Sequence, residues 1–264
     1  NAFNLKLSEL SAIVFYEKPF LKFERLVETH IAFSPKGFAS FSASMPIWLR
    51  EKLFQKNLIK ENLKKIDNTF KNDNSIKFSE HHLSHAASAF YPSPFEESLI
   101  LTLDGVGEWA TTSINIGRGN KIERIKEINF PHSLGLLYSS FTSYLGFKVN
   151  SGEYKLMGLA PYGRPIFKSK IYDYLIKVFD DGSFQLNMEY FNFATGLTMF
   201  NKKFEKLFGQ KGREPEKEKF SQFHMDIASS IQEVTEEIII EICKYLKKNY
   251  KFKNLCLAGG VALN

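Results

Sequence analysis

Hydrophobic and polar positions follow two different periods along this chain, and the periods predict both helices and strands. From Phe223 to Tyr245, apolar residues recur every three or four positions, which is the period of a long amphipathic helix. Short segments rich in apolar and β-branched residues and bounded by turn residues are typical of strands. Six segments have this character: Ser11–Tyr16, Ser75–Phe78, Glu96–Leu103, Trp109–Ile116, Lys121–Ile128 and Leu255–Leu257, of which the first and the last are expected to be buried. The pattern therefore predicts an α/β protein.

The segment from Lys18 to Asp67 has helical character, and we expect Pro35 and Pro46 to break it, because proline lacks the backbone N–H that a helix uses. Its aromatic side chains are expected to pack the segment together: Phe20, Phe23, Phe33, Phe38, Phe41, Trp48 and Phe54. Residues 1–10 have the pattern of the end of a helix. Residues 71–74 have the pattern of a surface turn.

Three of the six histidines lie between Glu80 and Phe90. If this segment is helical, His81 and His85 share one face, with Cβ atoms roughly 5–6 Å apart. Asp104 ends the strand that follows. Two imidazoles and one carboxylate suit a transition metal that must also bind a substrate oxygen. The alternative is a packed helix whose imidazole rings bond to backbone carbonyls.

Two glycine-containing segments after Asp104 are candidate anion sites. Gly105, Val106 and Gly107 form a tight turn, in which glycines permit positive φ and close approach of backbone N–H groups to a phosphate. Ser133 is expected to cap a helix that starts near Pro131, where free N–H groups could meet an anion beside Gly135. For Gly135, close helix packing is an equally good explanation.

Two later segments carry further candidates. Ser151–Gly163 has three glycines around Glu153 and Lys155, which indicates a mobile loop where Lys155 could meet a phosphate and Glu153 could accept a proton or orient Lys155. An ordinary surface turn is the alternative. Gly259 and Gly260 follow the long helix and a short strand, and leave space for a nucleoside on the backbone.

Four blocks of this sequence together resemble the NodU-type O-carbamoyltransferases, which modify nodulation factors, antibiotics and other hydroxylated metabolites. The blocks are His81–Phe90, Leu103–Glu108, Ser151–Gly163 and Leu257–Asn264, in the order in which the family has them. Residues 1–80 resemble the family more loosely.

The resemblance implies a two-lobed, actin/sugar-kinase-like (ribonuclease H-like) α/β fold with mixed sheets, shared with heat-shock chaperones. Residues 1–90 would be the remainder of the first lobe, with a helical aromatic insertion at 19–66. Residues 91–264 would be an incomplete second lobe, with an insertion at about 130–220. On this reading the chain is a fragment truncated at both ends, and we expect it to be inactive alone.

The resemblance also implies the chemistry. A missing C-terminal domain would make carbamoyl adenylate from ATP and carbamoyl phosphate, and this domain would transfer the carbamoyl group to an acceptor hydroxyl. A divalent metal, with Fe(II) expected, would be held by His81, His85 and Asp104. The residues expected to approach the phosphate or the nucleotide are Asp104, Gly105, Val106, Gly107, Gly135, Lys155, Gly259, Gly260 and Asn264. No general base is named; Lys155, Glu153 and His82 are the candidates for a catalytic role.

Composition changes this picture little. Cys243 lies in a helical pattern and Cys256 in a strand pattern, which favours reduced thiols and a cytoplasmic protein. No apolar run approaches the roughly 18 residues that span a bilayer.

The net charge is +6, but the lysines are mixed with glutamates and are not interleaved with stacking aromatics, which argues against nucleic acid as a partner. A mild positive field suits ATP and carbamoyl phosphate as anionic substrates. The sequence leaves open whether the protein forms a homodimer.

Two other classes of function stay open. A tRNA threonylcarbamoyl transferase would share the histidine pair and the Gly-Gly turn, but the aromatic insertion and the block at Glu153–Lys155 argue against it. A non-enzymatic ATP-binding module of the chaperone type would need no metal, so bound iron would count against it.

Overall fold

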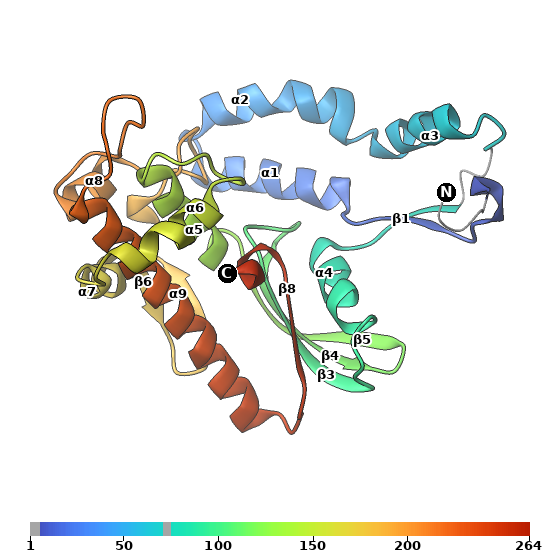
Figure 1. The fold of residues 1–264 in the computed structure, drawn as a ribbon. Coiled ribbons are helices and arrows are strands. Elements are labelled where there is room, and N and C mark those ends of the chain that lie inside the picture. The colour runs from blue at the N-terminus through green and yellow to red at the C-terminus, as the bar shows by residue number, and fades with distance from the viewer. Residues whose placement is uncertain (1–5, 71–74) are drawn as a thin grey trace. The chain divides into compact units, whose positions relative to one another are not determined.

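The computed structural model describes residues 6–70 and 75–264 (Figure 1). The chain forms two compact units. The first contains the residues up to Ser84 together with Gly107–Trp109, and the second contains His85–Val106 together with Ala110–Asn264. The predicted boundary between two actin-like lobes at residue 90 stays a prediction.

The first unit is a short parallel sheet joined by a helical segment. Strand β1 (Ile13–Phe15) pairs in parallel with β2 (Ile76–Phe78), and their phenylalanine rings meet edge to face, with centroids 5.8 Å apart. The connecting helices are α1 (Pro19–Phe33), α2 (Phe38–Ile47) and α3 (Gln55–Ile66), with a π-helical turn at Trp48–Lys52 and a 3-10 turn at Leu7–Glu9 before β1. Of residues 1–10, the described part holds only that single turn, and residues 71–74 lie outside the described residues.

Two expectations about this helical segment were wrong. The first concerns Pro46, which lies inside α2 and does not break it. Near the end of a helix the missing N–H of proline costs a single hydrogen bond, and the chain continues through the wider π turn. The expected break at Pro35 is confirmed. The aromatic side chains do not all pack inward. Phe20, Phe38 and Phe54 are each more than half exposed, since α1–α3 form one helical layer in which Pro19 is the single buried residue.

The second unit is built on a four-stranded mixed sheet in the order β5-β4-β3-β8. Its strands are β3 (Glu97–Leu103), β4 (Ala110–Arg118), β5 (Lys121–Asn129) and β8 (Leu255–Ala258). Strand β3 is antiparallel to β4 and parallel to β8, and six of its seven residues are buried, as expected of a strand covered on both faces. The predicted strands are thus present, and the α/β class with mixed sheets is confirmed.

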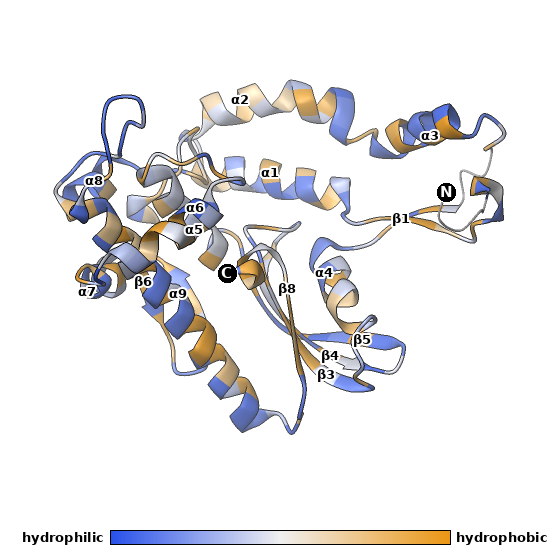
Figure 2. Ribbon diagram, viewed as in Figure 1, coloured by the Kyte–Doolittle hydropathy of each residue, from blue (hydrophilic) through white to orange (hydrophobic). Residues whose placement is uncertain are grey.

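Alternate residues of β3 face two different layers. On one face, Ile100 packs with Cys256 and with Ala86 and Phe90 of helix α4 (His81–Phe90). On the other, Leu99, Leu101 and Leu103 join the main core beneath helices α5 (Leu134–Tyr144) and α9 (Gln222–Asn249). Figure 2 shows the amphipathic character of α9 that the sequence predicted. Its apolar side supplies Ile227, Ile231, Val234, Ile238 and Ile242.

Two strands that were expected to be buried are only partly so. In the first, Val14 of β1 and Tyr16 beside it are 60% and 54% exposed, because β1 pairs with a single strand of the described chain.

The second of these strands is β8. Leu255 and Leu257 are 38% and 46% exposed, whereas Cys256 and Ala258 are buried. Side chains alternate between the two faces of a strand. Leu255 and Leu257 share a face on which they lack cover, whereas Cys256 on the other face packs with Ile100 and α4.

The residues between β5 and α9 add smaller elements to the same core. They are α6 (Glu153–Leu159), α7 (Lys168–Lys170), α8 (Lys202–Phe208), strands β6 (Ile176–Val178) and β7 (Phe184–Leu186), 3-10 turns at Ala160–Tyr162 and Met188–Tyr190, and a π turn at Ile171–Leu175. Strands β6 and β7 form an antiparallel hairpin. The chain closes on a 3-10 turn at Gly260–Leu263.

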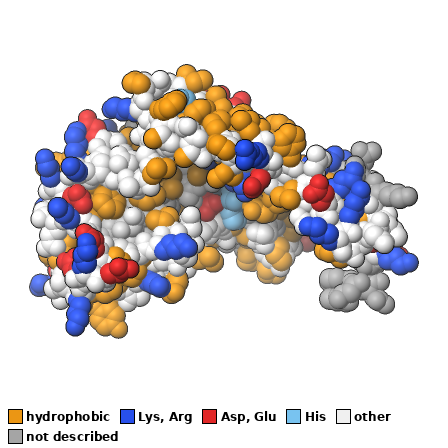
Figure 3. All heavy atoms as spheres, turned by 90° about the horizontal axis from the view of Figure 1, so that it is seen from above, with side chains coloured by type: hydrophobic (Ala, Val, Ile, Leu, Met, Phe, Trp, Pro, Cys, Tyr) orange, Lys and Arg blue, Asp and Glu red, His pale blue; other side chains and the backbone are white. Residues whose placement is uncertain are grey.

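The surface and the two thiols have ordinary properties. On the face in Figure 3, basic side chains are scattered among acidic and hydrophobic ones. Within the described residues, no helix combines the length and the apolar character needed to cross a membrane. Cys243 and Cys256 are both free thiols, and burial raises the pKa of Cys243.

Candidate functional site

The predicted histidine helix is present as α4, and an acidic side chain holds its N-terminus. The backbone N–H of His81 donates to both carboxylate oxygens of Glu108, at 3.1 and 3.0 Å. Glu108 is 7% exposed and also accepts the N–H of Lys18 at 2.8 Å. A buried carboxylate at this end satisfies an orphan donor and interacts favourably with the helix dipole. The sequence alone assigned no role to Glu108, although this residue directly follows the glycine turn.

The structure brings the three predicted metal ligands together. His85 Nε2 lies 3.4 Å from Asp104 Oδ2, and His81 lies one turn earlier on the same continuous helix. One potential ligand atom from each of the three residues lies within 4.8 Å of the others. Metal bonds of roughly 2.1 Å would place such atoms about 3.0–3.4 Å apart. The donor set therefore fits a first-row divalent ion after small side-chain movements.

His82 has a different environment from its two neighbours. Its side chain is 1% exposed, whereas His81 and His85 are both partly exposed. This burial agrees with the packed-helix interpretation for His82 and argues against contact with a substrate.

The turn after Asp104 is held by the start of helix α5. The hydroxyl of Ser133 accepts the N–H of Leu136 at 3.0 Å, which confirms the predicted cap, and it donates to the carbonyl of Gly105 at 2.6 Å. A side chain at Gly135 would place its Cβ 2.7 Å from the carbonyl oxygen of Asp104. Close packing therefore explains the glycine at 135. Gly105 does not use positive φ.

The Gly-Gly turn meets the same aspartate from the neighbouring strand. Because β8 runs parallel to β3, their carboxyl ends lie together, and the N–H of Gly260 donates to Asp104 Oδ1 at 3.3 Å. Gly259 has a φ of +94°, and a Cβ there would collide with the carbonyl of Leu103. Asp104 is thus held by Gly260 at one oxygen and faces His85 with the other.

Asn264 belongs to a hydrogen-bonded side-chain network that sequence reasoning missed. Its amide nitrogen donates to Gln232 on α9 at 3.3 Å, and its amide oxygen accepts from the same residue. The oxygen of Gln232 also accepts the hydroxyl of Tyr138 at 2.8 Å. A polar residue at the edge of the apolar stripe of α9 was the available signal, but many such residues face water.

The segment around Lys155 differs from the predicted mobile loop. Residues Glu153–Leu159 form helix α6, because Leu156 is fully buried in the core and outweighs the flexibility of the flanking glycines. Glu153 accepts the hydroxyl of Ser139 at 2.8 Å and the N–H of Asn150 at 3.0 Å. Lys155 is exposed, with its ammonium 5.9 Å from the ring centre of Tyr154. Glu153 therefore closes the start of the helix, and among the contacts of the described residues none joins it to Lys155.

Comparison with known proteins gives a match along the entire chain. Residues 1–264 match the family described as the carbamoyltransferase N-terminus. Similar proteins include the uncharacterized protein sll1178 of Synechocystis, which is 56% identical over 98% of this chain. The nodulation protein NolNO of Sinorhizobium fredii is 36% identical over 72%, and the uncharacterized protein MJ1058 of Methanocaldococcus jannaschii is 33% identical over 78%. The matched regions cover 42%, 26% and 33% of these relatives' own lengths, respectively.

Proposed function

Since this chain belongs to the carbamoyltransferase family, whose N-terminal region it matches from end to end, we propose that it transfers a carbamoyl group to a hydroxyl group of a small metabolite or sugar. The donor in this proposal is carbamoyl adenylate, which another part of the protein makes from ATP and carbamoyl phosphate. The observation that carries the proposal is the meeting of three separate sequence blocks at Asp104, which has His85 beside it and Gly260 bonded to it.

The transfer step is an acyl substitution at the carbamoyl carbon. The acceptor oxygen forms a bond to that carbon, the bond from carbon to the phosphate oxygen breaks, and AMP leaves while the hydroxyl loses its proton. The negative charge that accumulates on the phosphate must be stabilised by preorganised donors. Backbone N–H groups at Gly105, Val106 and Gly107 are the proposed donors, because they directly follow Asp104.

The side chains His81, His85 and Asp104 would hold a divalent metal, for which we propose Fe(II). Such an ion would supply a Lewis acid next to the phosphate. The bond from Gly260 to Asp104 Oδ1 leaves Oδ2 facing His85, so it would orient the carboxylate for binding. A hydrogen-bonded carboxylate of this kind is the usual support of a metal ligand.

The adenosine would lie at the Gly-Gly turn in this proposal. Gly259, Gly260 and Asn264 offer a backbone surface without bulky side chains, and Asn264 adds a positioned amide. The exposed ammonium of Lys155 would attract the phosphate through charge. Gly135 is tightly packed against the backbone of Asp104. It would therefore shape the base of the nucleotide site and would not contact the nucleotide.

Two of the similar proteins are nodulation proteins, NolNO of Sinorhizobium fredii and NolO of Bradyrhizobium diazoefficiens. This similarity favours a small hydroxylated acceptor over tRNA.

We propose an actin-like, two-lobed arrangement for the complete protein, as in the sugar kinases.

The test is an assay of the full-length protein with ATP, carbamoyl phosphate and a panel of sugars and hydroxylated metabolites. Mass spectrometry should detect a carbamoylated acceptor, and AMP should form in equal amount. Transfer to tRNA with none to small acceptors would refute the proposed acceptor class. ATP binding without any transfer, by a protein that holds no metal after purification without oxygen, would favour a chaperone-type module.

A further inference from the structure

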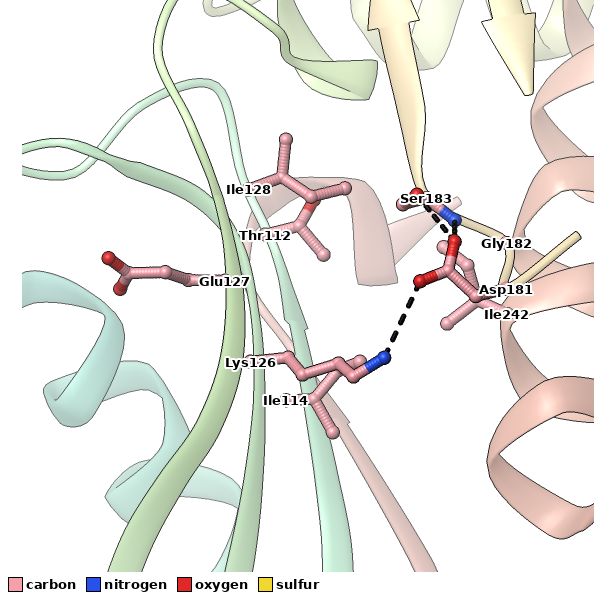
Figure 4. Close-up of a pocket in the computed structure, with 9 residues that line it drawn as sticks. All are labelled: Thr112, Ile114, Lys126, Glu127, Ile128, Asp181, Gly182, Ser183 and Ile242. Carbon is pink, nitrogen blue, oxygen red and sulfur yellow. Dashed lines mark hydrogen bonds and ion pairs between the residues drawn. The ribbon is translucent and has the colours of Figure 1, made fainter. Parts of the chain in front are cut away.

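The second unit contains a cavity of about 360 Å³ that includes none of the residues around Asp104 (Figure 4). One wall is the face of strands β4 and β5, and the other consists of the turn between β6 and β7 and of helix α9. The residues that matter for its chemistry are Thr112, Ile114, Lys126, Ile128, Asp181 and Ile242. Its volume lies within the range of about 300–1,000 Å³ that is usual for small-molecule sites.

The strand register explains why these side chains converge. Thr112 is paired with Ile128, and Ile114 with Lys126, so all four side chains project from the same face of the two strands. Glu127 lies between two of them and projects from the opposite face. Figure 4 shows it pointing away from the cavity, and its carboxylate accepts a hydrogen bond from Arg124 at 2.8 Å.

The polar part of the wall is a balanced ion pair. The Lys126 ammonium lies 3.4 Å from Asp181 Oδ2 and donates to the Tyr245 hydroxyl at 3.0 Å. The hydrogen bond to Tyr245 raises the pKa of Lys126, and the Ser183 hydroxyl lowers the pKa of Asp181. Both groups therefore stay charged at neutral pH, and an anionic or a cationic ligand would meet a like charge in the cavity.

The rest of the wall is apolar except for the hydroxyls of Ser183, which is bonded to Asp181, and of Thr112. Ile114, Ile128 and Ile242 supply aliphatic surface.

The Thr112 side chain is 2% exposed, and within the described residues its hydroxyl has no hydrogen-bond partner. The adjacent Thr111 hydroxyl, in contrast, bonds to the carbonyl of Ile128 at 3.0 Å. The Thr112 oxygen is buried away from the cavity surface, so the polar side chains that a ligand could reach are those of Lys126 and Asp181, which are partly exposed.

We propose that this cavity binds a small uncharged molecule whose apolar ring or chain carries a hydroxyl or carbonyl group. The aliphatic part would lie against the three isoleucines, and the polar group would accept a hydrogen bond from Lys126. The balanced charge of the wall selects against ions. The proposal does not depend on carbamoyl transfer, because it uses none of the residues assigned to that reaction.

The test uses the full-length protein and three probes with one carbon skeleton. They are 2-cyclohexylethanol, cyclohexaneacetate and 2-cyclohexylethylammonium, which differ in charge at the same end. Isoleucine methyl NMR gives a local readout, since Ile114, Ile128 and Ile242 all line the cavity. The alcohol should shift these three methyl signals saturably, and each ion should bind at least about tenfold more weakly.

Two variants and one control locate the binding. Ile128→Phe should fill the cavity and abolish the shifts at Ile114 and Ile242. Lys126→Met keeps a long side chain but removes the ammonium that would donate to the ligand, so affinity for the alcohol should fall several-fold. Glu127→Gln alters a side chain that points away from the cavity (Figure 4), and should leave binding unchanged.

Three results would overturn the proposal. The first is the absence of saturable shifts with all three probes, which would make the cavity a packing defect or a water site. The second is equal affinity for the alcohol and the ions. The third is unchanged binding in Ile128→Phe when circular dichroism shows the variant to be folded, because the probe would then bind elsewhere.

Discussion

At the scale of single residues, Asp104 connects the parts of the candidate site. Its carboxylate lies between His85 and the N–H of Gly260, and its backbone carbonyl lies against Gly135. Few side chains could replace it, because a longer one would move the carboxylate away from both partners. This environment makes its histidine neighbours the most direct targets for a metal-binding test.

His85→Ala should remove the metal. The full-length protein, purified without oxygen, should contain about one equivalent of iron, or zinc after misloading, because an N/O donor set discriminates poorly among first-row ions. Elemental analysis provides the measurement. Leu83→Ala, on the same helix, should retain the metal, since Leu83 is exposed and offers no donor. Equal metal content in the two variants would show that His85 is not a ligand.

Lys155→Ala should weaken binding of ATP or an adenylate analogue. A lost charged hydrogen bond costs about 1.5–3 kcal/mol, and the exposure of Lys155 places the expected effect at the low end of that range. Isothermal titration of the full-length protein measures it. Lys177→Ala, which removes another exposed ammonium, is the control for general charge loss. The assignment fails if both variants bind as the unmodified protein does.

At the scale of secondary-structure elements, the termini of helices position the site. Glu108 closes the start of α4, Ser133 closes the start of α5, and Glu153 closes the start of α6. Each group uses an orphan backbone donor at a helix start. These contacts orient the helices that carry the candidate residues.

Glu108→Gln should destabilise the protein, because the amide removes the charge and one of the two oxygens that accept the His81 N–H. The expected loss in the free energy of unfolding is about 1–2 kcal/mol. Denaturant titration measures this loss. Glu97→Gln breaks an exposed ion pair with Arg118 and should cost less than about 0.5 kcal/mol. A reversed order of the two effects would contradict the role of Glu108.

Gly135→Ala and Gly158→Ala form a matched pair of helical substitutions. The first would force a Cβ to 2.7 Å from the backbone oxygen of Asp104, and should cost about 1–3 kcal/mol through strain. The second meets open space on α6, and should stabilise by up to about 1 kcal/mol because alanine favours helices. Thermal unfolding distinguishes them. Equal melting temperatures would show that the contact between α5 and the Asp104 turn can relax.

At the scale of the whole molecule, two histidines whose pKa values are lowered by partial or complete burial link stability to pH. Burial lowers the pKa of His132 below its usual 6.5, and burial also lowers that of His224. The Nδ1 of His132 accepts the N–H of Leu186 at 3.1 Å, so the neutral ring ties strand β7 to the segment before α5. Protonation at this nitrogen would break that contact.

The free energy of unfolding should therefore decrease as the pH falls below about 6.5. The sign follows because the unfolded chain binds protons at its ordinary histidine pKa, whereas the folded chain binds them only at lower pH. The stabilisation is complete above the unfolded pKa and is lost as the pH falls toward the folded values. His132→Asn keeps an acceptor but cannot titrate, and should flatten the profile. Denaturant titrations between neutral and mildly acidic pH give the slopes, and an identical slope in the variant would exclude His132.

Local patterns determined the elements of this protein. The long apolar period of α9, the cap at Ser133 and the histidine spacing on α4 are properties of adjacent residues, so they could be predicted before any fold was known. Helix spacing likewise predicted that His81 and His85 share a face. The order of the four blocks was sufficient to indicate the family that the chain matches.

Only the tertiary structure decided which neighbours those elements meet. It made a helix of the glycine-flanked segment at Lys155, because Leu156 is buried in the core, and it left Leu255 and Leu257 exposed at a sheet edge. It joined Gly260 to Asp104 through the parallel pairing of β8 with β3, across 156 positions of sequence. It also created the cavity beside Thr112 from three separate segments. Such contacts depend on packing between distant residues, and no period within one segment contains that information.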